Sequence, residues 1–147
     1  MTAPDIIAAN RTLTLTVGIP ASGKTTWALA AGFDCEICLD DCRKKLWGDP
    51  GVQDGPGGLP VLLEFQAQEI RAAMRENKRI VVHNTNILKA HRLPIIEMAK
   101  AAGYHVRIVF FDVPVEECIW RNKNRDNPVP EAVIRQFHEA LEVPEPD

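Results

Sequence analysis

The chain of 147 residues is 46% hydrophobic and carries a formal net charge of −3, which predicts one domain with a proper core and leaves no room for a second of ordinary size. The negative balance argues against broad, sequence-independent wrapping of nucleic acid, which needs a basic face. Neither a membrane-spanning apolar run nor a secretory signal pattern is present in the sequence, so we expect residence in the cytoplasm and no membrane partner.

The first third of the chain predicts two strands, two short helices and a loop. Apolar residues alternate with threonine over residues 13–17, which is typical of a strand. A short helix follows and is expected to stop at Gly32, since glycine suits the left-handed backbone of a helix end. Residues 35–39 predict a second strand, and a helix follows to about Trp47. Residues 48–60 are rich in glycine and proline, which predicts a flexible loop.

The remainder of the chain continues the alternation of helices and strands. The predicted strands are residues 80–82 and 106–111, and the predicted helices are residues 61–77, 90–102, 114–124 and 130–141. This order predicts an α/β domain in three layers, with a parallel sheet of about four strands and helices on both faces. We expect a single domain over residues 1–147, with flexible tails at residues 1–11 and 143–147.

A phosphate-binding loop is predicted between the first strand and the first helix, where Gly18 to Thr25 matches the pattern G-x-x-x-x-G-K-[ST]. Gly18 and Gly23 allow successive backbone N–H groups to point at an anion, which a Cβ would obstruct. Lys24 is expected to neutralise the phosphates, and the Thr25 hydroxyl to bind Mg²⁺. The pattern predicts binding of ATP or another nucleoside triphosphate. The contacting residues are predicted to be Gly18, Ala21, Ser22, Gly23, Lys24, Thr25 and Thr26.

Asp40 and Arg43 follow the second predicted strand. Ligands of a parallel sheet bind beyond the carboxyl ends of its strands, so both side chains are expected near the nucleotide. Asp40 is our candidate for the carboxylate that accepts the proton of an attacking hydroxyl. Arg43, one turn later, is the candidate that holds a phosphate of the acceptor. The alternatives are that Asp40 only caps the next helix and that Arg43 is a solvated surface residue.

Further candidates follow the third strand and lie in the last third of the chain. Asn84 and Thr85 come directly after residues 80–82 and are predicted to contact the acceptor. Arg125 lies in a segment whose composition suits a mobile lid, and it is the candidate that stabilises charge on the transferring phosphate. Arg121, four residues earlier, projects along the same helix face and is predicted to contact the nucleotide too. A basic surface patch is the alternative for the two arginines.

Three of the four cysteines, Cys35, Cys38 and Cys42, have a spacing that suggests a metal or redox site. Cys35 and Cys38 fall in a predicted strand, where residues three apart face opposite sides and cannot easily share one ion. A tetrahedral site would need a fourth ligand, and only the distant Cys118 is left. Packing as small buried thiols is therefore the preferred interpretation.

Together these residues resemble the polynucleotide 5′-hydroxyl kinases of phage and bacterial nucleic-acid repair. The resemblance spans residues 12–141. Four blocks of sequence carry the resemblance. The first three are Gly18 to Ala28, Asp40 to Arg43, and the pair Thr85 and Asn86. The fourth runs from Phe111 to Pro114 through Arg121, Asn122 and Arg125 to Val129 and Pro130. It implies a P-loop kinase fold and transfer of the γ-phosphate of ATP to the 5′-hydroxyl end of DNA or RNA. In that reaction Lys24 and Thr25 would hold phosphate and Mg²⁺. Asp40 would act as general base, with Arg43 on the acceptor phosphate and Arg125 on the donor.

The chain departs from the resembled family at two positions. The family usually has an aspartate before the Thr-Asn pair, where this chain has Asn84, and often a basic residue before the aspartate pair, where it has Leu39. Two other functions stay open: a kinase of the same fold that acts on a hydroxymethylated base in DNA or on a small nucleoside or metabolite, and a non-enzymatic nucleotide-binding protein. Asp40 and Arg43 argue against the second, because binding alone needs neither.

Overall fold

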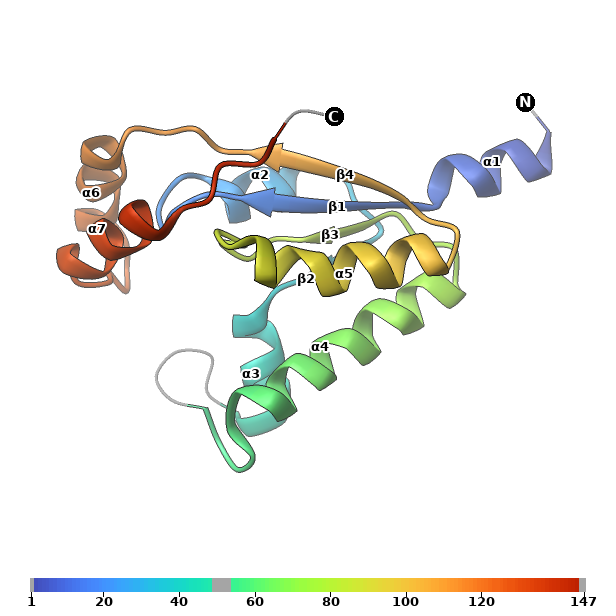
Figure 1. Ribbon diagram of the computed structural model, residues 1–147, viewed down its shortest axis with the longest axis horizontal. Coiled ribbons are helices and arrows are strands. Elements are labelled where there is room, and N and C mark those ends of the chain that lie inside the picture. Colours follow the sequence, from blue (N-terminus) through green and yellow to red (C-terminus); the bar gives the residue numbers. More distant parts are fainter. Residues whose placement is uncertain (1, 49–53, 146–147) are drawn as a thin grey trace.

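The computed structural model describes residues 2–48 and 54–145 and has an α/β fold built on one parallel sheet (Figure 1). The strands are β1 (Thr12–Val17), β2 (Cys35–Ile37), β3 (Ile80–Val82) and β4 (His105–Phe110). Their order is β2-β3-β1-β4, and Leu13 of β1 pairs with Ile80 on one side and Val106 on the other. The predicted fold class is confirmed: helices flank an all-parallel, four-stranded sheet.

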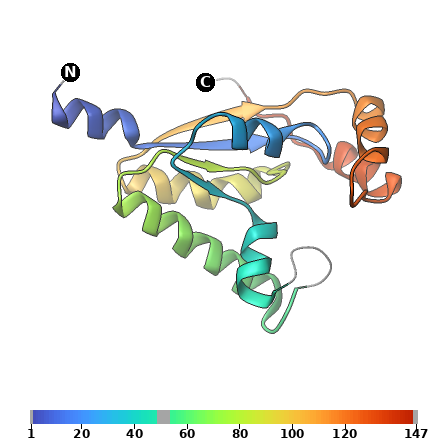
Figure 2. The ribbon, with the colours of Figure 1, turned by 180° about the vertical axis from the view of Figure 1, so that it is seen from behind.

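Helices pack on both faces of the sheet, as Figures 1 and 2 show. α4 (Gly58–Arg75) and α5 (Lys89–Ala101) cover one face, and α2 (Lys24–Ala30) lies over the other. The main core lies under α4 and α5, because the inward side chains of β1 and β3 alternate toward that face. Its fully buried members include Leu13, Leu15, Ile80 and Val82 from the strands, Leu62 and Ile70 from α4, and Ala99 from α5.

The remaining helices lie at the two ends of the sheet (Figure 1). α3 (Leu39–Trp47), α6 (Val115–Lys123) and α7 (Glu131–Ala140) stand near the carboxyl ends of the strands, where a ligand is expected to bind. Ile19, Cys118, Ile119 and Ile134 form a second small core that fixes α6 and α7 to the end of β1. Within the described ranges, no helix is both long and apolar enough to cross a bilayer.

Two segments contain helical structure that the sequence analysis did not predict. Within residues 1–11, for which a flexible tail is expected, Ala3–Asn10 form the helix α1. Its start has a capping box that the prediction missed: the Thr2 N–H donates to Asp5 Oδ2 at 3.0 Å and the Asp5 N–H to Thr2 Oγ1 at 3.4 Å. In the predicted loop, residues 49–53 lie outside the described residues, and α4 already begins at Gly58 rather than after Pro60.

Candidate active site

The phosphate loop, residues 18–25, leaves β1 and turns directly into α2. Its first turn is anchored because the Gly18 N–H donates to the Thr85 carbonyl at 3.0 Å. A Cβ on Gly18 would lie 2.6 Å from Ser22 Oγ, so the close approach of the chain requires glycine. Gly23 precedes α2 with φ +97° and Ala21 has φ 66°, both in the left-handed region. The loop thus winds around the N-terminus of α2, the geometry that binds anions.

Lys24 lies under this loop and is only 8% exposed. Its Nζ donates to the Ile19 carbonyl at 2.8 Å and contacts Ser22 Oγ at 3.4 Å. Burial lowers the pKa of Lys24 to about 8, since a charged amine loses hydration there. The Cys118 thiol counteracts this effect, and the positive charge of Arg125 adds to it. A phosphate in the loop would supply the missing counter-charge.

A cleft of about 840 Å³ opens in front of the loop and collects almost all of the predicted site residues. We call it the phosphate cleft. The predicted residues that line it are Ala21, Gly23, Lys24, Thr25, Thr26, Asp40, Arg43, Asn84, Thr85, Arg121 and Arg125. Gly18 and Ser22 do not line it, because they form the inner turn of the phosphate loop. Residues from four separate stretches of the chain therefore meet at one edge of the sheet.

Asp40 lies in the first turn of α3, but it does not cap the helix, so the capping alternative is wrong. The cap is Cys38, whose Sγ accepts from the Asp41 N–H at 3.4 Å. The Asp40 side chain is 70% exposed, and its carboxylate accepts from Arg43 Nη1 at 2.9 Å. Arg43 also donates through Nε to Asp54 at 2.9 Å and is mostly buried. It is therefore tied to two carboxylates rather than solvated on the helix surface.

Asn84 joins three elements at the end of β3. Its Oδ1 accepts from the Leu39 N–H at 2.8 Å, and its Nδ2 donates to Gln66 Oε1 of α4, also at 2.8 Å. The amide therefore caps the first turn of α3 from outside and holds it against α4. Thr85 contributes its carbonyl to the phosphate loop at Gly18.

His83 is a site residue that the sequence analysis did not select. It follows β3 directly, is 6% exposed, and places Nδ1 at 3.3 Å from the Thr25 hydroxyl. Burial lowers the pKa of His83, although the negative charges of Asp41 and Glu36 oppose this effect. P-loop NTPases usually hold their Mg²⁺ with the loop threonine and a strand-end aspartate. In this chain an imidazole stands beside that threonine instead.

Arg121 and Arg125 approach the phosphate cleft from α6 and the turn after it. Arg121 Nη1 lies 3.4 Å from the Ser22 carbonyl, and its Nε contacts Glu117 at 3.1 Å. Arg125 is exposed on the rim of the cleft. The segment that bears Arg125 is anchored at its far end, because the Asn122 amide both donates to and accepts from the backbone of Val129 at 2.7 and 3.0 Å.

The cysteines do not form the site suggested by their spacing. Cys42 is buried in the main core and Cys35 packs against it, as the thiol-packing interpretation predicted. Cys38 faces the other way, toward the phosphate cleft. Burial raises the pKa of the Cys38 thiol to about 12, with a smaller opposing effect of the Asp41 N–H.

A second cleft of about 650 Å³ lies between α4 and α5, and we call it the side cleft. It shares Leu39, Asn84, Thr85 and Phe137 with the phosphate cleft, so the two spaces meet beyond the ends of β2 and β3. Its walls are mostly apolar and include Leu59, Leu63, Pro94 and Met98. The sequence showed no motif here, since these residues belong to ordinary amphipathic helices.

Comparison with known proteins gives the class of this chain. Residues 13–144 match the AAA domain family, so the chain belongs to that family, an ATP-binding family of P-loop kinases. Among curated proteins, the chain is 23% identical over 140 residues to the L-seryl-tRNA(Sec) kinase of Methanococcus maripaludis. That match covers 90% of this chain and 53% of the relative. The chain thus spans about half the length of the curated relative.

Solved structures share the fold at low sequence identity. A chain of the Pnkp1/Rnl/Hen1 RNA repair complex superposes with a TM-score of 0.76 at 19% identity, over 90% of this chain and 44% of that one. The APS kinase CysC of Mycobacterium tuberculosis, in complex with AMPPNP and APS, superposes with a TM-score of 0.59 at 18% identity, over 78% and 70% of the two chains. A chain of an RNA repair complex and an APS kinase thus share this architecture.

Proposed function

We propose that this chain transfers the γ-phosphate of ATP to the 5′-hydroxyl end of DNA or RNA. The observation that carries the proposal is the phosphate cleft, where one space joins the phosphate loop to the carboxylate of Asp40 and the guanidinium of Arg43. A protein that only bound nucleotide would need the loop alone. The resemblance of residues 12–141 to polynucleotide kinases supports this acceptor, as does the fold shared with a chain of an RNA repair complex.

The donor side of the reaction uses the loop and the two arginines. Backbone N–H groups at the end of the phosphate loop, residues 23–25, and the charge of Lys24 would hold the β- and γ-phosphates. Thr25 is exposed in the cleft and offers a hard hydroxyl oxygen, so it fits Mg²⁺, which supplies charge neutralisation on the phosphates. Arg121 already reaches the loop at Ser22, and Arg125 on the rim would stabilise the charge that develops on the transferred group.

The acceptor side begins at Asp40. Its exposed carboxylate would accept the proton of the attacking hydroxyl, while the ion pair with Arg43 fixes its direction. Arg43 would hold the phosphate next to that hydroxyl by exchanging one of its two carboxylate partners for it. Asn84 and Thr85, at the junction of the clefts, would contact the acceptor.

A second candidate function follows from the side cleft. Its apolar walls between α4 and α5 suit a compact group such as a nucleoside, or a modified base extruded from DNA. A kinase for such an acceptor would use the same donor residues. The two candidates differ in what enters the side cleft and in whether Arg43, in the phosphate cleft, contacts a phosphate of the acceptor.

The test is transfer of label from γ-labelled ATP to parallel acceptors. We expect label on 5′-hydroxyl DNA or RNA oligonucleotides and none on the same oligonucleotides with a 5′-phosphate. Label confined to nucleosides or hydroxymethylated DNA would replace the first candidate with the second. No transfer to any acceptor, with tight ATP binding intact, would contradict both.

Two variants separate catalysis from binding in this assay. Lys24→Ala should abolish transfer and weaken nucleotide binding. Asp40→Asn should leave ATP affinity nearly intact and lower turnover by about 10²-fold or more, the range for loss of a general base. Asp112→Asn is the matched control, since this carboxylate is exposed after β4 and does not line the phosphate cleft. Equal turnover of Asp40→Asn and Asp112→Asn would exclude Asp40 as the base.

A further inference from the structure

His83 has two ring nitrogens in different surroundings. Nδ1 faces the Thr25 hydroxyl at 3.3 Å, on the side of the phosphate loop. Nε2 is buried, and in the described part of the chain it finds no hydrogen-bond partner. An unpaired nitrogen in a side chain that is 6% exposed is costly unless something else binds it. The ring therefore presents one nitrogen that the kinase mechanism above does not use.

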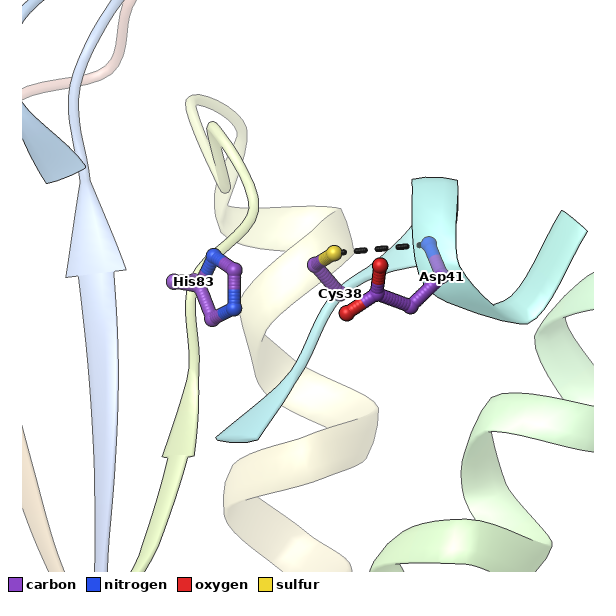
Figure 3. A group of neighbouring side chains, drawn as sticks. All are labelled: Cys38, Asp41 and His83. Atoms are coloured by element: carbon purple, nitrogen blue, oxygen red, sulfur yellow. Dashed lines mark hydrogen bonds between the residues drawn. The ribbon is translucent and has the colours of Figure 1, made fainter. Parts of the chain in front are cut away.

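That nitrogen is directed toward two other possible ligands, as Figure 3 shows. Cys38 precedes α3 and Asp41 lies in its first turn, while His83 comes from the end of β3. One donor atom from each of the three side chains lies within 4.8 Å of the other two. The side chains thus converge from the segments that follow two neighbouring strands, β2 and β3.

We propose that Cys38, Asp41 and His83 bind a divalent transition metal of the zinc class. Sulfur, nitrogen and carboxylate oxygen together suit zinc and cobalt, whereas Mg²⁺ takes oxygen ligands. Ligands of a tetrahedral ion lie about 3.5 Å apart, so small side-chain rotations would bring the three donors into place. The fourth position would be left for water or a bound molecule.

The surroundings of the three residues fit this role. The Asp41 N–H already donates to Cys38 Sγ at 3.4 Å, and such a bond would also stabilise the thiolate that a metal needs. If His83 carries its proton on Nδ1, that N–H donates to the Thr25 hydroxyl and leaves Nε2 free as a ligand. On binding, the metal would form a bond to sulfur and the thiol proton would pass to solvent.

The proposed ion would connect the two halves of the kinase site. It would tie the start of α3, and with it Asp40, to the end of β3. By binding His83 Nε2, the ion would also fix the imidazole whose Nδ1 faces the Thr25 hydroxyl. The ion would therefore position the acceptor-side carboxylate relative to the phosphate loop, separately from any Mg²⁺ on the nucleotide.

The test is titration of the metal-free protein of 147 residues with Co²⁺, followed by absorption. We expect one equivalent of Co²⁺ to produce a thiolate-to-cobalt charge-transfer band, and one equivalent of Zn²⁺ to remove it. Cys38→Ser and His83→Phe should abolish the band. Cys35→Ser is the matched control and should keep it, since Cys35 packs against the core. Serine is itself a good helix N-cap, so Cys38→Ser is expected to fold.

Thermal unfolding provides a second measurement that does not depend on phosphoryl transfer. Zn²⁺ should raise the Tm of the wild-type protein and of Cys35→Ser, but not that of Cys38→Ser. Absence of a charge-transfer band in the wild type, or a band that survives in Cys38→Ser, would overturn the proposal. Because neither measurement uses ATP or an acceptor, this outcome is independent of the proposed kinase function.

Discussion

The buried position of Lys24 predicts that nucleotide affinity falls as the pH rises from 7 to 9. With a pKa of about 8, about nine tenths of this lysine is charged at pH 7 and about one tenth at pH 9. Only the charged amine can pair with the phosphates, and the bound phosphates hold the proton on it. The Kd should therefore rise about tenfold between pH 7 and pH 9.

Calorimetry of ADP or a non-hydrolysable ATP analogue measures this effect directly. Titrations in buffers of different ionisation enthalpy give the number of protons taken up on binding. We expect about one tenth of a proton per nucleotide at pH 7 and about nine tenths at pH 9, because the free protein has lost that proton at the higher pH. The sign is fixed by the lowered pKa: binding must take up protons.

Two variants show whether Lys24 is the group concerned. Lys24→Met should bind weakly, with an affinity that no longer changes between pH 7 and pH 9. Lys44→Met is the control, since this lysine is exposed on α3 and does not line the phosphate cleft. A wild-type Kd that stays constant over this range, or proton uptake that persists in Lys24→Met, would refute the reasoning.

Three further substitutions test the loop and the acceptor side. Gly18→Ala places a Cβ 2.6 Å from Ser22 Oγ. We expect a lower Tm, a loss of about 1–3 kcal/mol in the free energy of unfolding, and weaker nucleotide binding. An unchanged Tm would show that the loop adapts to the added methyl group. Arg43→Gln removes both carboxylate contacts of Arg43, and turnover should fall by up to about 10²-fold with ATP affinity unchanged by calorimetry. Asn84→Asp keeps the acceptor for the Leu39 N–H but loses the N–H that donates to Gln66 Oε1, so the Gln66 amide must rotate to donate to the new carboxylate. Turnover on 5′-hydroxyl ends should be kept or raised; a strong loss with normal ATP binding and an unchanged Tm favours the small-acceptor alternative.

The sequence predicted well where the signal is local. Alternating threonines and apolar residues defined β1, and the spacing from Gly18 to Thr25 defined the phosphate loop. The helices predicted to begin at Pro114 and Pro130 begin one residue later, at Val115 and Glu131. In each case the residues that carry the information are neighbours in the chain. The order of strands and helices then sufficed to predict a parallel sheet.

Contacts between residues far apart in the chain could not be predicted in the same way. The sequence placed Asn84 near the acceptor, but its bonds to Leu39 and Gln66 join residues 45 and 18 positions away. The role of Cys38 as the N-cap of α3 was not predicted, because cysteine is a rare N-cap residue. From the sequence, Cys38 was considered only together with Cys35 and Cys42. His83 was passed over because a histidine after a buried strand has no fixed meaning until its neighbours are known.

The position of Asp40 shows why those long-range contacts matter for function. Its helix begins at the carboxyl end of β2, where Cys38 caps it from within and Asn84 caps it from β3 through the Leu39 N–H. Each contact binds a backbone N–H within the first turn, so the turn that carries Asp40 cannot rotate without breaking them. A metal held by Cys38 and Asp41 would add a third restraint on the same turn, from His83, which directly follows the neighbouring strand β3. The role proposed for Asp40 as general base would therefore depend on side chains that need not touch the substrate.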